Sequence, residues 1–269
     1  MRPSTAQARS SVTGSSLWQL AGRVAVVTGA SRGLGAAMAL ALAQAGASLV
    51  LWARHAAGLK RVAGQIRAVG QPVHAEIVDV TNRPAIRRAV SSAIRRFGRL
   101  DILINNAGIW DGGPFARLDL SAWTRVLHAD LTSVLLVSQQ ALPSMIRQRY
   151  GKIINISSTS ALLAHPDGAA YGSAKAALMH LTRIMAVELG PSGIRVNGIA
   201  PGLFRTAMTR DVFADRAWVA RRKAQIPLRR FGDPVDLSGL AVFLAAPASD
   251  HITGQTIVID GGASLATGV

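Results

Sequence analysis

The sequence predicts an α/β fold: a doubly wound parallel sheet in a single domain, with helices on both faces. Short runs of β-branched and apolar residues alternate with stretches of helical composition, as βαβ crossovers require. The first of these runs, Val24–Val27, is unbroken, which is typical of a strand buried on both faces. The chain has 269 residues and no internal repeat, so its length suits one domain with a sizeable core.

The remaining elements follow from the same patterns in chain order. Further strands are expected at Ser48–Ala53, Val73–Val78, Leu100–Asn105, Lys152–Ser158, Ile194–Ile199 and Gln255–Asp260. Helices are expected after Gly35 and at Ala56–Ala68, Thr81–Phe97, Ser121–Arg149, Tyr171–Leu189 and Asp233–Ala246, with a mobile helical excursion at Arg205–Arg230. Residues 1–16 lack apolar periodicity and predict a flexible extension before a domain of residues 17–269; their Arg- and Ser-rich, acid-free composition is also compatible with an organelle transit peptide.

The turn after the first strand is rich in glycine and predicts a phosphate site. Its sequence, TGASRGLG, places Gly29, Gly33 and Gly35 between a strand and a helix. Glycines let the backbone approach a pyrophosphate closely, and the helix N-terminus offers free N–H groups and a positive dipole end. The spacing is T-G-x-x-x-G-x-G rather than G-x-G-x-x-G. Glycines at such a turn can also be purely structural, so the turn alone leaves both interpretations open.

The end of the second strand indicates which dinucleotide would bind. A carboxylate there would bind the adenosine ribose of NAD and repel a 2′-phosphate. This chain instead has Ala53 followed by Arg54, with Arg32 in the glycine-rich turn and no Asp or Glu before Glu76. Arginine pairs with phosphate, so the cofactor predicted is NADP rather than NAD.

Composition excludes several classes of protein. The formal charge is +16, and 26 of the 30 basic residues are Arg, which reflects either coding bias or attraction of anionic ligands. No Cys is present, which excludes disulfides and thiolate metal sites and is compatible with a cytoplasmic location. No stretch suggests a membrane span, a signal peptide or a nucleic-acid module, and no histidine has convincing metal-ligand spacing.

Taken together, the motifs resemble the short-chain dehydrogenase/reductase family from about Leu17 to Ser264. They occur in the family's order: TGASRGLG, Asp79-Val80, NNAG at Asn105–Gly108, Ser158, Tyr171-x-x-x-Lys175 and Pro201-Gly202. The resemblance implies a Rossmann-type sheet of about seven parallel strands, a nicotinamide cofactor, and a homodimer or homotetramer. It also implies that the cofactor lies along Asn105 and a set of cofactor-binding residues: Gly29, Ser31, Arg32, Gly33, Leu34, Gly35, Arg54, Asp79, Val80, Asn106, Ala107, Gly108, Tyr171, Lys175, Pro201, Gly202, Leu203 and Thr206.

Three residues predict acid–base chemistry. Tyr171 and Lys175 are four apart on an expected helix and therefore share a face. An isolated tyrosine is a poor acid–base catalyst at neutral pH, and a nearby ammonium favours the phenolate and lowers that pKa. Ser158, at the end of a strand, could hydrogen-bond a substrate carbonyl. The resemblance gives Lys175 a second role, binding the nicotinamide ribose.

One residue departs from the family's pattern. Many members carry Asn in a segment like VNL, where it holds a water of the proton relay, whereas this chain reads HADL and has Asp130 there. A carboxylate could accept hydrogen bonds from that water or pair with Lys175, but it cannot donate as an amide does. Asp130 is therefore a candidate catalytic residue, with a purely structural role as the alternative.

The function predicted is hydride transfer between NADP(H) and a carbonyl or secondary alcohol. The substrate is of the 3-oxoacyl thioester type or the sugar-acid and polyol type; the alternative is a non-catalytic NADP-binding regulator or a basic nucleic-acid-associated protein. The substrate side should include Ile109–Phe115, Thr159–His165 and a lid at about residues 203–230. From Arg205 to Arg230, eight basic residues face two acidic ones, which favours an anionic substrate or is simply a solvated basic surface.

Overall fold

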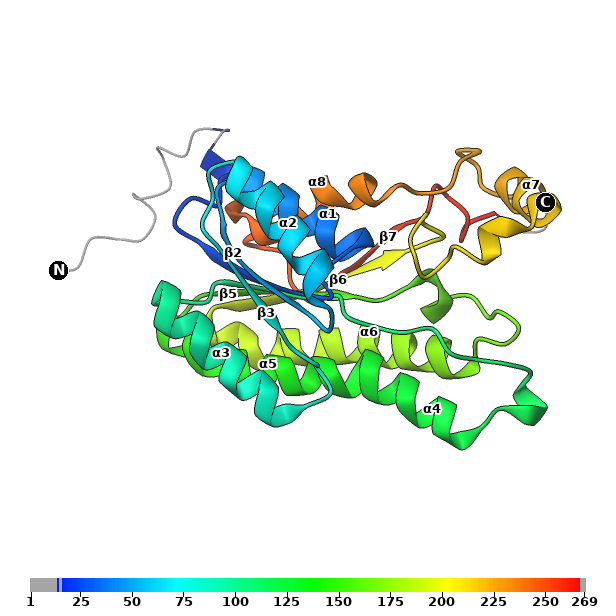
Figure 1. Cartoon of the computed structure of the whole chain (residues 1–269), viewed down its shortest axis with the longest axis horizontal. Coiled ribbons are helices and arrows are strands. Elements are labelled where there is room, and N and C mark those ends of the chain that lie inside the picture. Colours follow the sequence, from blue (N-terminus) through cyan, green and yellow to red (C-terminus); the bar gives the residue numbers. More distant parts are fainter. Residues whose placement is uncertain (1–13, 15, 267–269) are drawn as a thin grey trace.

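Seven parallel strands form one sheet, which confirms the predicted fold class (Figure 1). The computed structural model describes Gly14 and residues 16–266, so the extension predicted for residues 1–16 lies almost wholly outside the described residues. The strand order is β3-β2-β1-β4-β5-β6-β7. The strands are β1 Val24–Thr28, β2 Ser48–Ala53, β3 Val73–Ile77, β4 Ile102–Asn105, β5 Gly151–Ile156, β6 Ile194–Pro201 and β7 Thr256–Ile259.

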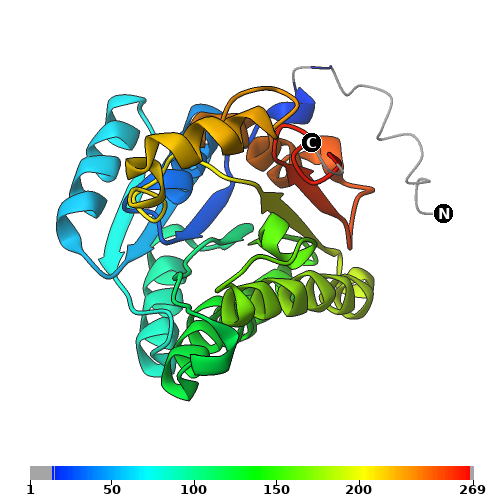
Figure 2. The same ribbon diagram turned by 90° about the vertical axis from the view of Figure 1, so that its right-hand side faces the viewer.

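Helices cover both faces of this sheet (Figures 1 and 2). The first layer contains α1 Gly33–Gln44, α2 Ala56–Ala68 and α8 Ser238–Ala245. The second contains α3 Arg83–Phe97, α4 Leu120–Leu127, α5 Ser133–Gln148 and α6 Ala169–Leu189. Within the described part of the chain, no helix is both long enough and apolar enough to cross a membrane.

Strand β1 shows why an unbroken apolar run marks a central strand. Ala25 and Val27 are buried in the core beneath α1, α2 and α8, whereas Val24 and Val26 are buried in the core beneath α3, α5 and α6. Alternate side chains of a strand point to opposite faces, so no position of the run Val24–Val27 faces water. Each fully buried Val contributes roughly 1.5–3 kcal/mol.

The segment predicted as one helix at Ser121–Arg149 is interrupted. Helix α4 ends at Leu127, a π-helical turn occupies His128–Thr132, and α5 begins at Ser133. A π-helical turn holds one more residue than a regular turn and is often found at functional sites. Sequence periodicity does not distinguish this turn from regular helix. Pro143, a residue type that usually breaks or kinks a helix, lies inside α5 without ending it.

The helix expected at Asp233–Ala246 starts differently. Residues Pro234–Leu237 form a tight 3₁₀ turn, and α8 begins only at Ser238. The Asp233 side chain accepts a hydrogen bond from the backbone N–H of Val235, and the Asp236 side chain accepts one from that of Asp233. These two caps stabilise the turn as a start for α8.

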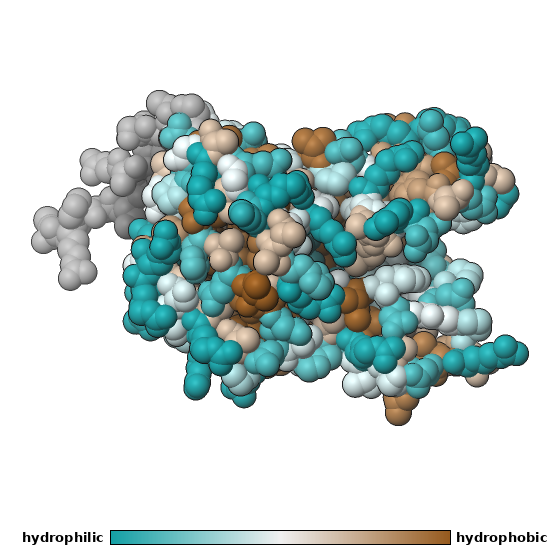
Figure 3. Space-filling model, in the orientation of Figure 1, coloured by the Kyte–Doolittle hydropathy of each residue, from teal (hydrophilic) through white to brown (hydrophobic). Residues whose placement is uncertain are grey.

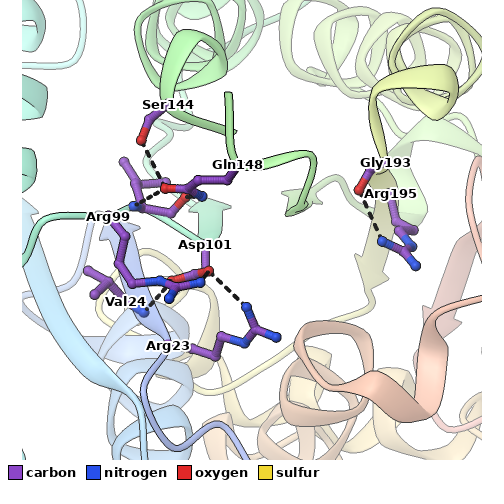
Figure 4. A network of polar contacts seen from close by, with 9 residues as sticks. Arg23, Val24, Arg99, Asp101, Ser144, Gln148, Gly193 and Arg195 are labelled. Atoms are coloured by element: carbon purple, nitrogen blue, oxygen red, sulfur yellow. Dashed lines mark hydrogen bonds and ion pairs between the residues drawn. The ribbon is translucent and has the colours of Figure 1, made fainter. Parts of the chain in front are cut away.

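An ionic network closes the amino end of the sheet (Figure 4). The carboxylate of Asp101 is fully buried and accepts hydrogen bonds from Arg99 Nε and Nη2, each at 2.7 Å, and from Arg23 Nη1 at 3.1 Å. It also accepts the backbone N–H of Val24 at 3.0 Å. The buried charge is therefore paired and hydrogen-bonded, as burial requires.

The segment predicted as a lid leaves the sheet after β6. Its base is closed where the backbone N–H of Arg205 donates to Gly232 and that of Gly232 donates to Leu203. Between these points lies α7, Arg216–Ala224, which stands out beyond the sheet in Figure 1. The two ends of this segment are therefore joined by backbone hydrogen bonds.

Candidate active site

A cavity of about 270 Å³ opens at the carboxyl ends of the strands. Figure 3 shows the hollow on the right-hand side of the molecule, between the part that carries α7 and the part that carries α4. Parallel α/β sheets bind their ligands at this end. Of the residues predicted to bind the cofactor, Leu203 does not line the cavity. Those that do are Gly29, Ser31, Arg32, Gly33, Leu34, Gly35, Arg54, Asp79, Val80, Asn106, Ala107, Gly108, Tyr171, Lys175, Pro201, Gly202 and Thr206.

The glycine-rich turn forms one wall of the cavity and has no room for a side chain at Gly29 or Gly35. Gly29 has φ +67°, and a Cβ on it would lie 2.7 Å from Asn106 Nδ2. A Cβ on Gly35 would lie 2.5 Å from the same atom and from the Gly29 carbonyl oxygen. Arg32 precedes α1 and makes no side-chain cap, so the first N–H groups of the helix remain directed at the cavity. This cradle fits the phosphates of a dinucleotide.

A hydroxyl ties this turn to the next strand. Thr28 Oγ1 accepts the backbone N–H groups of Asn106 at 2.9 Å and Ala107 at 3.0 Å, and it donates to the carbonyl of Ile104. Asn106 Nδ2 donates in turn to the carbonyls of Thr28 and Gly29. The ends of β1 and β4 are therefore held together beneath the cavity.

Two arginines and one aspartate stand at the far end of the cavity. Arg32 and Arg54 line it beside Ala53 and Asp79. Hydrogen bonds from the backbone and hydroxyl of Thr81 lower the pKa of Asp79, and the charge of Arg54 acts in the same direction. Asp79, which follows β3, is thus an anion near Arg54.

Asn105 does not line the cavity, although the resemblance placed it along the cofactor. Its Nδ2 donates to Asn155 Oδ1 at 2.9 Å and to Ser138 Oγ at 3.2 Å, and its side chain is buried. Successive residues at the end of β4 point in opposite directions, so Asn106 faces the glycine-rich turn and Asn105 faces the core beneath α5.

Helix α6 brings Tyr171 and Lys175 to the cavity, and the turn that follows β5 brings Ser158. Lys175 Nζ lies 5.4 Å from the centroid of the Tyr171 ring and donates to the Ile156 carbonyl at 3.0 Å. Ser157 Oγ donates to the Lys175 carbonyl at 2.9 Å, which fixes α6 against the end of β5. Ser158 Oγ accepts the backbone N–H of Ser160 and lines the cavity with the other two.

Asp130 pairs with Lys175, which is one of the two interactions expected for it. Its Oδ2 lies 3.0 Å from Lys175 Nζ, and its Oδ1 accepts the backbone N–H of Ile109 at 2.8 Å. Both charges are buried. Burial alone would lower the pKa of Lys175, but the charges of Asp130 and Tyr171 and the hydrogen bond with Asp130 together raise it. The lysine is held as an ammonium ion.

The substrate side contains a residue that the sequence patterns did not single out. The Trp110 ring meets the Tyr171 ring edge-on, with centroids 5.1 Å apart. An aromatic residue two positions after NNAG was the available signal. His165, considered as a substrate contact, does not line the cavity; burial and the charge of Arg222 lower its pKa. Among the described residues, no three His, Asp or Glu side chains gather where they could hold a metal ion.

Comparison with known proteins places the chain in a family. A family model described as enoyl-(acyl carrier protein) reductase matches residues 29–264. The chain is 42% identical to an uncharacterized oxidoreductase of Mycobacterium tuberculosis, over 91% of this chain and 94% of that protein. It is 38% identical to gluconate 5-dehydrogenase of Gluconobacter oxydans, over 93% and 97%. The crystal structure of a gluconate 5-dehydrogenase from Burkholderia cenocepacia in complex with NADP and tartrate superposes with a TM-score of 0.91 at 35% identity, covering 95% of this chain and all of that one.

These matches extend over most of the chain and agree with the motifs and the fold. The protein belongs to the short-chain dehydrogenase/reductase family. It is an oxidoreductase that acts on CH–OH and C=O groups.

Proposed function

We propose that the protein transfers a hydride between NADP(H) and a small anionic substrate of the sugar-acid type, interconverting a ketone and a secondary alcohol. One observation carries the proposal: the cavity joins the phosphate cradle and two arginines to Tyr171, Lys175 and Ser158. The similar Burkholderia structure is a gluconate 5-dehydrogenase in complex with NADP and tartrate, which supports both the cofactor and the substrate class.

The cavity residues divide between holding the cofactor and serving the reaction. The N–H groups at the start of α1 would hold the pyrophosphate, and Arg32 and Arg54 would hold the 2′-phosphate. Lys175 would hold the nicotinamide ribose. When bound, the nicotinamide supplies or accepts the hydride.

Tyr171 would give its phenolic proton to the substrate oxygen during reduction and take it back during oxidation. The Lys175 ammonium, 5.4 Å from the ring centroid, stabilises the negative charge that develops on the phenolic oxygen. Ser158 Oγ would donate a hydrogen bond to the substrate oxygen. Asp130 keeps the ammonium charged and in place, so we assign it a positioning role in the acid–base system.

The basic lid supports an anionic substrate. The charge of Arg222 in α7 lowers the pKa of His165, so this guanidinium lies within electrostatic range of the loop that follows Ser158. Members of this family that reduce substrates on an acyl carrier protein often have two basic carrier contacts, at the places of Arg149 and Ser192 in this chain. A carrier-bound substrate is less well supported here, because serine stands at the second place. At the first place, Arg149 caps α5 before the amino end of β5 and donates to the Pro191 carbonyl, away from the cavity.

Activity measurements at two salt concentrations test this proposal. With saturating NADPH, a keto sugar acid should be reduced with a kcat/KM that falls steeply between low and high salt. A neutral ketone measured in parallel should show a weaker salt dependence, because salt screens charge beyond a Debye length of about 8 Å at physiological ionic strength. Equal salt dependence for the two substrates would point instead to a neutral ketone or polyol.

Cofactor choice is tested by a double variant, Ala53→Asp with Arg54→Ser. The new carboxylate would repel a 2′-phosphate and the lost guanidinium would no longer pair with it. A charge-assisted contact contributes roughly 1.5–3 kcal/mol, so NADP affinity should fall on the order of ten- to a hundredfold while NAD affinity rises. Fluorescence titration with both nucleotides measures this change, and equal binding of NAD and NADP by the unmodified protein would contradict the proposal.

We further propose that the protein is a homodimer or homotetramer. Apolar side chains stand exposed on the outer surface of α5 and α6, namely Leu135, Ile146, Ile184 and Val187. A second copy covering this surface would remove it from water. Sedimentation equilibrium gives the number of subunits.

A further inference from the structure

Trp110 is held against the residue that would transfer the proton. Its indole meets the Tyr171 ring edge-on at 5.1 Å between centroids, a favourable geometry for an aromatic pair. Even so, 47% of its surface is exposed. Trp110 itself does not line the cavity, but its chain neighbour Ile109 and its ring partner Tyr171 do, so the indole stands next to the lining. Tryptophan is usually well buried, so a half-exposed indole in this position offers apolar area to a ligand that extends past Tyr171.

Both neighbours of Trp110 in the chain are anchored. The backbone N–H of Ile109 donates to Asp130, the carboxylate that also pairs with Lys175. On the other side, Asp111 forms an ion pair with Arg125 of α4 at 2.7 Å. The carboxylate of Asp130 therefore fixes both the start of this loop and the Lys175 ammonium beside Tyr171.

The loop also packs tightly on the turn that leads into α6. A Cβ on Gly112 would lie 2.0 Å from the Asp167 carbonyl oxygen, so only glycine fits there. A Cβ on Gly168 would come within 3.4 Å of the Trp110 ring. Helix α6 begins at Ala169 and carries Tyr171, so Trp110 is fixed relative to the helix whose tyrosine it touches.

We propose that Trp110 is a specificity-determining residue that positions the Tyr171 ring and forms the apolar wall against which the carbon skeleton of the substrate lies. The inference rests on the proposed function and deepens it. Removing the indole frees the tyrosine ring, which slows turnover of every substrate. It also removes a contact that only substrates with a longer carbon chain make, which weakens their binding further.

Kinetics with two neutral ketones test both effects without a contribution from charge. The probes are butan-2-one and hexan-2-one, with saturating NADPH. For butan-2-one, Trp110→Ala should lower kcat by about three- to tenfold, the range that an aromatic pair supports. For hexan-2-one, kcat/KM should fall by a larger factor through an added rise in KM. Trp110→Phe keeps an aromatic edge and should stay within about threefold of the unmodified enzyme for butan-2-one.

Trp18→Ala is the matched control. Trp18 has 49% of its surface exposed and pairs with Phe243 of α8, with ring centroids 5.6 Å apart, so it is a half-exposed tryptophan without a contact to Tyr171. It should leave both ketones unaffected. Unchanged NADPH affinity shows that each variant is folded, and Trp110→Leu replaces Trp110→Ala should the latter fail that check. Equal kinetics of Trp110→Ala and the unmodified enzyme, or an equal loss in Trp18→Ala, would overturn the inference. If the unmodified enzyme reduces a keto sugar acid but neither ketone, this inference alone fails. If it reduces none of them, the proposed function fails as well.

Discussion

Two buried lysines lie near opposite ends of strand β5: Lys152 belongs to the strand itself, and Lys175 reaches its carboxyl end from α6. Their immediate partners are similar, but their pKa values shift in opposite directions. Lys152, near the amino end of the strand, is 1% exposed; its Nζ donates to the Ala246 carbonyl and lies 2.9 Å from Asp250. Lys175, at the carboxyl end, is 4% exposed; its Nζ donates to the Ile156 carbonyl and lies 3.0 Å from Asp130. Each ammonium thus has one backbone carbonyl and one carboxylate, and Lys152 Nζ also donates to the hydroxyl of Ser249 at 2.9 Å.

The carboxylates make the difference. Asp130 is fully buried, whereas the side chain of Asp250 is 39% exposed and is shared with Arg195. Burial lowers the pKa of Lys152 despite its contact with Asp250, and the charges of Arg195 and Arg23 lower it further. At Lys175, Asp130 and Tyr171 outweigh burial and raise the pKa. A lysine that must stay charged beside a reacting group needs a carboxylate that water does not screen.

The largest difference should be in turnover. Lys175→Met and Tyr171→Phe should each lower kcat by about two to four orders of magnitude, the range of general acid–base catalysis. Lys152→Met should leave kcat within a factor of about three, because Lys152 does not line the cavity. NADPH oxidation with a keto sugar acid measures all three, and circular dichroism confirms folding. A comparable loss in Lys152→Met would erase the distinction between the two lysines.

The two carboxylates should differ in the pH dependence of the reaction. Asp130→Asn removes the charge that opposes burial at Lys175, so its ammonium should lose a proton at lower pH. The pH at which kcat falls on the alkaline side of the profile should then be lower by about 1–3 units. Asp250→Asn, at the other end of β5, is the control and should leave the profile in place. An unchanged profile for Asp130→Asn would make Asp130 a structural residue only.

Stability at alkaline pH should separate the lysines by a smaller amount. The raised pKa of Lys175 contributes to the free energy of unfolding. This contribution is fully present below the pKa of an unfolded lysine, about 10.4, and is lost as pH rises through the pKa in the folded protein. The lowered pKa of Lys152 means that folding disfavours its charge, so stability rises with pH between the folded value and about 10.4. In urea unfolding, the free energy of unfolding of the unmodified protein should therefore rise relative to that of Lys152→Met by on the order of 1 kcal/mol as pH approaches 10. A difference between the two proteins that does not change with pH would contradict this.

Much of the fold could be predicted from the sequence, because a sheet buried on both faces leaves continuous apolar runs such as Val24–Val27. The glycine-rich turn and the Tyr171–Lys175 spacing were also visible, since each depends on residues close together in the chain. The ordered set of motifs then identified the family, which comparison confirmed.

The rest depends on contacts between distant segments. The burial that makes Asp130 a partner for Lys175 comes from packing α6 on the π-helical turn, which periodicity does not reveal. Asn105 looked like Asn106 in sequence, and only the pleat of β4 sends one into the core and the other toward the cavity. Trp110 acquires its position from the close approach of Gly112 to Asp167, some fifty residues further along the chain.

The π-helical turn at His128–Thr132 also bears on how this chain tolerates insertions and deletions. Such a turn equals a regular helix with one residue added, and the helices on either side keep their own packing. Losing one residue from it would let α4 and α5 run on as a single regular helix with their apolar faces still inward. The carboxylate of Asp130 would no longer be aimed at Lys175. Deleting one residue here should therefore remove the ion pair while both helices persist, which separates the requirements of the site from those of the fold.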